Sequence, residues 1–220
     1  MKTYDPTTNL KYKFPGLNVI KENYSQTYQD MFVLTMLNGK QHGKFLEIGA
    51  QDPIVFSNTY LLETIFGWNG ISIDIDETVV QKHKELRKNN FILGNALKVN
   101  YEAVLSNYPK QIDYLQIDID PSIQSFNCLS MLPLKDYRFS VITFEHDAYR
   151  DENGSYVRTA SRTILKQHGY ILMAGNISNT SHDDVYEDWW VDPNTVDPKL
   201  IEMFQRGENA NIPGDEFLAA

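Results

Sequence analysis

The sequence of 220 residues has a single cysteine, Cys128, and no long apolar run. One cysteine excludes an internal disulfide, a CxxC redox motif and a cysteine-rich zinc site, and it suits a reducing cytoplasm. No window approaches the roughly 18 apolar residues of a membrane span. The opening residues also lack the apolar stretch of a secretory signal. We therefore expect a cytoplasmic protein that neither spans nor is anchored to a membrane.

Basic residues are also scarce. The chain has 20 lysines and arginines against 29 aspartates and glutamates, a net charge of −9. An acidic surface repels a phosphate backbone, which disfavours a nucleic-acid partner and leaves a small molecule as the expected one. The length is near that of one large domain, and a hydrophobic content of 42% is enough for a real core.

The glycine pattern of a dinucleotide-binding loop is incomplete. The segment Glu47-Ile-Gly49-Ala50 resembles the start of such a loop, because Gly49 lets the backbone approach a ligand closely. The fingerprint needs further glycines two and five residues later, where this chain has Gln51 and Ile54. The loop therefore suits a nucleoside without a pyrophosphate, although an ordinary turn after a strand explains Gly49 as well.

Three apolar stretches end on carboxylates, and strands of this kind alternate with helical patterns along the chain. The stretches cover residues 44–50, 70–76 and 113–120, and the motif Ile-Asp-Ile-Asp occurs in the last two. This alternation predicts an α/β doubly wound, mostly parallel sheet, with the ligand at the carboxyl ends of the strands. Residues 170–174 and 188–191 are expected to pair antiparallel. We expect an extended or loose arm over 1–22 and a single domain over 23–220 that ends in a loop and helix extension.

The second and third strand ends offer contacts for a nucleoside. Asp74 can accept both ribose hydroxyls in a bidentate manner. Asp76 is better explained as the N-cap of the next helix. Asn95 offers an amide to an adenine edge, and the small Ala96 leaves room for the ring, although a plain turn explains this pair equally well.

Four segments resemble the FkbM-type branch of class I S-adenosylmethionine-dependent methyltransferases. These are Ser25-Gln-Thr-Tyr-Gln-Asp30, Phe45-Leu-Glu-Ile-Gly-Ala-Gln-Asp52, Ser57-Asn-Thr-Tyr-Leu-Leu-Glu63 and Gly67-Trp-Asn-Gly-Ile-Ser-Ile-Asp74. The resemblance implies a seven-stranded Rossmann-like sheet with a reversed last strand and S-adenosylmethionine as the cofactor. It implies cofactor contacts at Glu47, Gly49, Asp74, Asn95 and Ala96, with Ala50 in the same loop. Pro53 stands where the family often has glycine, so we expect a stiffer loop.

The reacting edge is expected at the fourth and fifth strand ends, where two mechanisms stay open. In one, Asp118, Glu145 and Asp147 hold Mg²⁺ or another divalent cation through oxygen ligands, which resembles metal-dependent catechol and macrolide-sugar O-methyltransferases. In the other, His146 takes the proton of an acceptor hydroxyl and is oriented by Asp120 or Asp147. The alternative is that these acids only cap helices and that His146 is a turn residue with satisfied hydrogen bonds.

Two adjacent tryptophans, Trp189 and Trp190, follow acidic residues near the end of the chain. They suit either a carbohydrate pocket or a core.

The favoured hypothesis is S-adenosylmethionine-dependent O-methylation of a small polyhydroxylated or sugar acceptor. A nicotinamide-dependent oxidoreductase on the same fold and a non-catalytic cofactor-binding module are the alternatives.

Overall fold

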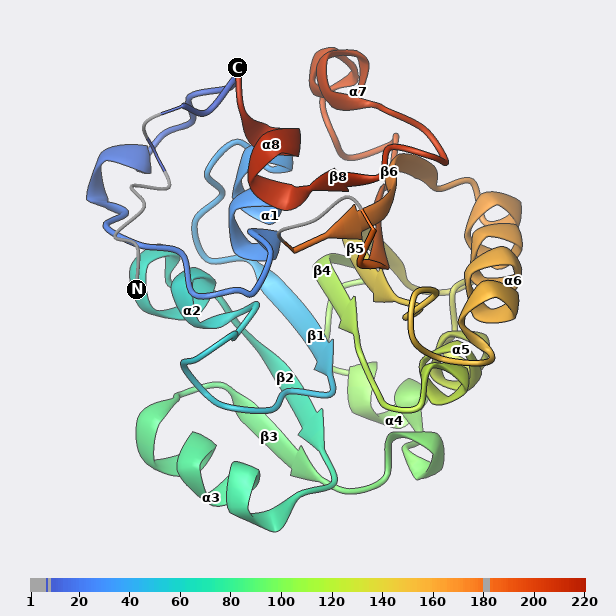
Figure 1. Ribbon diagram of the computed structural model, residues 1–220. Coiled ribbons are helices and arrows are strands. Elements are labelled where there is room, and N and C mark those ends of the chain that lie inside the picture. The colour runs from blue at the N-terminus through green and yellow to red at the C-terminus, as the bar shows by residue number, and fades with distance from the viewer. Residues whose placement is uncertain (1–6, 8, 180–182) are drawn as a thin grey trace.

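One eight-stranded sheet runs through the molecule. The computed structural model describes residues 7, 9–179 and 183–220, and the strands pair in the order β3-β2-β1-β4-β5-β7-β6-β8 (Figure 1). The strands are β1 (Lys44–Ile48), β2 (Asn69–Asp74), β3 (Asn90–Leu93), β4 (Gln111–Ile117), β5 (Arg138–Glu145), β6 (Ile171–Ser178), β7 (Val185–Val191) and β8 (Ile212–Pro213). Strands β1 to β5 are mutually parallel, and β7 lies antiparallel between β5 and β6.

The predicted fold class is confirmed, including the late antiparallel strand, but the strand number of seven is wrong. The eighth strand pairs in parallel with the end of β6 through Ile177 and Ser178. It contains only two residues. Such a short segment has no sequence period, so its pairing could not be predicted.

Helices cover both faces of the sheet (Figure 1). The helical segments are η1 (Leu17–Val19), α1 (Gln29–Met36), α2 (Tyr60–Phe66), α3 (Glu77–Leu86), η2 (Ala96–Lys98), α4 (Tyr101–Leu105), α5 (Ser122–Met131), α6 (Gly154–Gln167), α7 (Pro198–Phe204) and α8 (Gly214–Leu218). One apolar cluster joins α1, α2, α7 and α8 to the sheet, and a second joins α4, α5 and α6 to the other face. In the part of the chain that the structure describes, no helix is long and apolar enough to cross a membrane.

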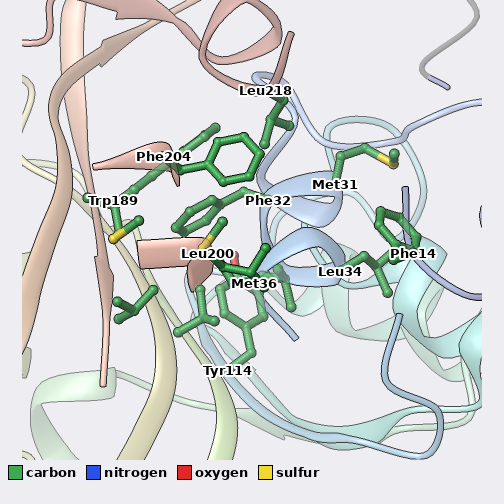
Figure 2. Packing of buried hydrophobic residues seen from close by; sticks show 14 of the residues in the cluster. Phe14, Met31, Phe32, Leu34, Met36, Tyr114, Trp189, Leu200, Phe204 and Leu218 are labelled. Carbon is green, nitrogen blue, oxygen red and sulfur yellow. The ribbon is translucent and has the colours of Figure 1, made fainter. Parts of the chain in front are cut away.

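The two tryptophans belong to the core. Trp189 and Trp190 are fully buried in opposite clusters, because successive residues of β7 point to opposite faces of the sheet. The Trp189 ring stacks on Phe32 of α1 with ring centroids 4.4 Å apart, and Figure 2 shows this contact among the packed side chains. The carbohydrate-pocket interpretation of this pair is therefore wrong.

The described part of the N-terminal arm also packs onto the first cluster. Leu10, Phe14, Leu17 and Ile20 are buried there. The Lys11 N–H donates to Leu218 O at 2.9 Å, so the arm runs beside the C-terminus. Residues 1–6 and 8, which belong to the same predicted arm, lie outside the described residues.

Two helix starts show how well local patterns predict structure. Asp76 caps α3 as expected, with its Oδ1 accepting the Thr78 N–H at 2.7 Å. At the start of α5, by contrast, Pro121 takes the N-cap position, and its side chain makes no capping hydrogen bond to the described residues.

Candidate functional site

Two cavities adjoin at the carboxyl ends of the parallel strands. Parallel strands gather their tips at one edge, and this is where ligands bind in open α/β sheets. The first, named here the apolar cavity, has a volume of about 370 Å³, and the second, the polar cavity, about 340 Å³. Gly49, Gln51, Asp118 and Asp120 line both.

The apolar cavity lies over the tips of β2, β3 and β4. Its remaining lining residues are Ile73, Asp74, Ile75, Gly94, Asn95, Ala96, Leu97, Ile119, Pro121 and Gln124. Most of these offer apolar side chains or bare backbone, and a Cβ added to Gly94 would meet no atom within 4 Å. Such a lining suits a flat ring that needs few polar contacts.

Asp74 supplies a carboxylate at the β2 tip of this cavity. Its Oδ2 accepts the Gln51 N–H at 2.9 Å, and its Oδ1 accepts the Asp76 N–H at 2.9 Å. Each ionised carboxylate oxygen can accept a second hydrogen bond. These backbone contacts orient Asp74 at the strand tip and leave capacity for a vicinal diol.

Asn95 and Ala96 also lie where the sequence places them, on the wall of the apolar cavity. The Asn95 Oδ1 accepts the Leu97 N–H at 2.9 Å and so caps η2. The turn explanation and the ligand explanation are therefore compatible, because the same side chain forms the turn and lines the wall.

Gly49 permits the close approach of β1 to β4. Its φ of 86° is left-handed, and a Cβ at this position would lie 1.7 Å from the Asp118 carbonyl oxygen. No other residue fits without moving the β4 tip. From the sequence, Gly49 was expected to let the backbone approach a ligand closely. In the structure, its lack of a side chain also lets the backbone of Asp118 pack against it.

The polar cavity spans the tips of β1, β4, β5 and β7. It is lined by Gln26, Gln29, Glu47, Ala50, Phe56, Asn58, Gln116, Glu145, Asp147, Tyr149, Arg150, Asn179, Asp184 and Tyr186, in addition to the four shared residues. Glu47 and Ala50 are thus on this side and not in the apolar cavity.

Glu47 is held by a buried network that also fixes the loop after β1. Its oxygens accept from the hydroxyls of Thr59 at 2.9 Å and Ser72 at 2.5 Å. Burial raises the pKa of Glu47, and the positive charge of nearby Arg87 opposes this shift. Arg87 also donates to Thr59 at 2.9 Å and to the Pro53 carbonyl at 3.0 Å, so Pro53 is an anchored part of the loop.

Asp118 and Glu145 form a carboxyl pair across the tips of β4 and β5. Burial raises the pKa of Asp118 to about 6, while a hydrogen bond from Glu145 opposes that shift. Burial and the charges of Asp118 and Asp147 raise the pKa of Glu145 well above its ordinary value. Near neutral pH the pair therefore shares one proton, which resides on Glu145 and leaves Asp118 as the anion.

Arg150 occupies the place among these acids where a metal ion was expected. Its guanidinium lies 2.7 Å from Asp147, 3.3 Å from Asp120 and 3.7 Å from Glu145. Among the described residues, no three histidine, cysteine, aspartate or glutamate side chains are arranged to hold a metal ion. The structure therefore does not support the metal set Asp118, Glu145 and Asp147. A guanidinium and a shared proton relieve the repulsion of the carboxylates instead.

His146 is turned away from both cavities. It is fully buried, its Nδ1 accepts the Ala148 N–H at 3.1 Å, and its Nε2 lies 3.3 Å from Asp188. Because Nδ1 accepts, Nε2 carries the proton and donates to Asp188. Arg162 also donates to Asp188, at 2.7 Å, and the pKa of Asp188 is held below its usual range. Neither Asp120 nor Asp147 orients the ring, so the geometry does not favour His146 as the base.

Several cavity residues were missed by reasoning from sequence. Gln26 comes from the segment before α1 and Gln29 is the first residue of α1, while Phe56 and Tyr149 line the cavity with exposed fractions of 63% and 47%. Phe56 has a left-handed φ of 60°, which is rare for a bulky side chain. No pattern in the sequence marked Phe56 or Tyr149 as a cavity residue, because their places depend on how the loops after β1 and β5 pack.

Comparison with known proteins identifies the fold. No protein-family model matches the sequence, and no functionally curated protein matches it. Solved structures do match. The O-methyltransferase from Bacillus cereus in complex with S-adenosylhomocysteine has a TM-score of 0.52 at 14% identity, covering 79% of this chain and 83% of that chain. The fold is that of class I methyltransferases.

Two further structures share this methyltransferase fold. A methyltransferase dependent on S-adenosylmethionine from Aquifex aeolicus has a TM-score of 0.50 at 14% identity, covering 76% of this chain and 91% of that chain. The fibrillarin of Aeropyrum pernix with natively bound S-adenosyl-L-methionine has a TM-score of 0.50 at 13% identity, covering 69% of this chain and 67% of that chain.

Proposed function

We propose that this chain is an S-adenosylmethionine-dependent methyltransferase that methylates a hydroxyl of a small polyhydroxylated acceptor, such as a sugar. The observation that carries the proposal is the meeting of the two cavities at Asp118 and Asp120. A nucleoside in the apolar cavity and an acceptor in the polar cavity would face each other there. The solved neighbours that bind S-adenosylmethionine or S-adenosylhomocysteine support the same cofactor.

The residues present fit this cofactor. Asp74 would hold the ribose hydroxyls, and Asn95 and Ala96 would border the adenine. Gly49 and Ala50, with buried Glu47 beneath them, would lie beside the amino-acid portion. The cofactor supplies an electrophilic methyl group on a sulfonium, which needs little further activation.

The acceptor hydroxyl needs a base, and we assign that role to Asp118. Asp118 lines both cavities and is the anionic member of its pair with Glu145, so it can take the hydroxyl proton. Asp120 and Asp147, fixed by Arg150, would position the acceptor. His146 keeps a structural role beneath the site in this proposal.

Phe56 and Tyr149, and not Trp189 and Trp190, would provide the aromatic surface on which a sugar ring stacks. Both rings are exposed, and both residues line the polar cavity, where an apolar ring face beside carboxylates suits a sugar. The left-handed backbone at Phe56 is strained, and strained residues concentrate at ligand sites.

The finer assignments are proposals as well. The quoted segments support membership of the FkbM-type branch. One continuous sheet supports a single domain over 23–220 with an arm over 1–22. The lone buried Cys128, a free thiol, supports a reducing cytoplasm.

The test is transfer of a labelled methyl group from S-adenosylmethionine to a panel of sugars and other small polyols. We expect a methyl ether on at least one acceptor, with turnover unchanged by EDTA because Arg150 already fills the place of a cation. Activity lost with EDTA and restored by Mg²⁺ would overturn the assignment of Asp118 as a base acting without a metal. Labelling of nucleic acid but of no small acceptor would overturn the acceptor class.

A further inference from the structure

The polar cavity has an unbalanced set of charges. Its described lining includes Glu47, Asp118, Asp120, Glu145, Asp147 and Asp184, against one cationic side chain, Arg150. The guanidinium of Arg150 serves three of these acids at once, at 2.7 to 3.7 Å. Even with Glu145 protonated, the anions exceed the cations. A ligand with positive charge would be attracted, and one with a carboxylate or phosphate would be repelled.

Two buried oxygens on residues that line this cavity have no hydrogen-bond partner in the part of the chain that the structure describes. They are Asn58 Oδ1, on a residue that is 8% exposed, and Asp147 Oδ1, on a side chain that is 3% exposed. An unmatched buried polar atom is costly, and native proteins usually satisfy such atoms. Both of these atoms can only accept hydrogen bonds. The missing group is therefore a donor.

We propose that the acceptor carries a protonated amine, so that the hydroxyl to be methylated belongs to an amino alcohol such as an amino sugar. An ammonium brings three N–H donors and a positive charge, which match the orphaned oxygens of Asn58 and Asp147 and the excess of carboxylates. The inference rests on the proposed function, since it assigns the polar cavity to the acceptor. It selects one class among polyhydroxylated compounds.

The cofactor also carries an ammonium, so the test must separate the two. We would first saturate the protein with S-adenosylhomocysteine, which has the same amino-acid group, and then titrate three probes of one ring shape by calorimetry. The probes are glucosamine, glucose and glucuronate. Any preference for the amine measured on this complex belongs to the acceptor site.

We expect glucosamine to bind the complex about tenfold more tightly than glucose, which corresponds to about 1.4 kcal/mol. Glucuronate should bind weakest. Asp147→Asn should reduce the ratio of glucosamine to glucose affinity to about one, because it removes the anionic oxygen while asparagine tolerates the left-handed φ of 51°. Asp136→Asn removes the same charge at the opposite end of β5, outside the polar cavity, and should keep the wild-type ratio.

Equal binding of glucosamine and glucose, or no binding of glucosamine, would overturn the amine proposal. Neither result affects the proposed function, which fails separately if S-adenosylhomocysteine itself does not bind. An unchanged ratio in Asp147→Asn, with S-adenosylhomocysteine affinity and melting temperature intact, would also contradict the proposal.

Discussion

The apolar and polar cavities differ in how the chain builds them. The apolar cavity draws mainly on the tips of β2, β3 and β4, each with its own following turn. The polar cavity also draws on the segment before α1, the loop after β1, the tip of β5 and the start of β7. The cofactor half of the proposed site is therefore a local property of each strand, whereas the acceptor half depends on tertiary packing.

The largest expected effect concerns the base at the junction of the two cavities. Asp118→Asn should lower kcat by roughly 10²- to 10⁴-fold, because the acceptor hydroxyl loses its proton acceptor. Affinity for S-adenosylhomocysteine, measured by calorimetry, should change much less.

Glu145→Gln is the matched control. Glutamine resembles the protonated form of Glu145 and can still donate to Asp118, so kcat should fall only a few fold. A loss in Glu145→Gln as large as in Asp118→Asn would show that both carboxylates take part in the chemistry.

The second effect concerns the apolar cavity alone. Asp74→Ala removes two charge-assisted contacts to the ribose and should weaken S-adenosylhomocysteine binding by about 100-fold, or roughly 3 kcal/mol. Asp76→Ala, two residues away, should cost about 1 kcal/mol of unfolding free energy through the lost cap and leave the affinity unchanged. An equal dissociation constant for wild type and Asp74→Ala would remove Asp74 from the site.

The third prediction is a pH profile of kcat/KM. A base must be ionised to act, so activity should fall about tenfold per pH unit below the Asp118 pKa of about 6 and level off above it. The acidic limb should persist in a His146→Gln variant, although that variant is expected to melt at a lower temperature. If the fall of kcat/KM at acidic pH disappeared in His146→Gln, His146 and not Asp118 would be the base.

The smallest effect concerns the rim of the polar cavity. Phe56→Ala should raise the acceptor KM by about 3- to 10-fold, in line with the roughly 1 kcal/mol of a ring contact, while kcat and cofactor affinity stay the same. The neighbouring Val55 is also exposed but does not line the cavity, so Val55→Ala should leave KM unchanged. Equal KM values in wild type and Phe56→Ala would show that the ring does not contact the acceptor.

The sequence predicted those features that depend on local order. The alternation of strands and helices led to the correct fold class, although the sheet has eight strands and not seven, and Asp76 was correctly expected to cap α3. The acids at the tips of β1, β2, β4 and β5 were correctly expected to gather at one edge. Each of these follows from periodicity or from a cap.

The burial of His146, Trp189 and Trp190 depends on packing between segments that are distant in the sequence, so local patterns did not predict it. His146 is buried because β7 brings Asp188 against β5, a contact between residues 42 positions apart. Trp189 is covered by Phe32 of α1. The pairing of Arg150 with Asp147 is local, three residues apart in the turn after β5, but no sequence pattern indicated the shape of that turn.

The most direct measurement is a calorimetric titration of the wild-type protein with S-adenosylhomocysteine and, separately, with NAD. The account predicts saturable binding of one S-adenosylhomocysteine per chain and no binding of NAD. Binding of NAD without S-adenosylhomocysteine would contradict the account in favour of an oxidoreductase. Binding of neither would contradict it in favour of a protein that has kept the fold without the cofactor.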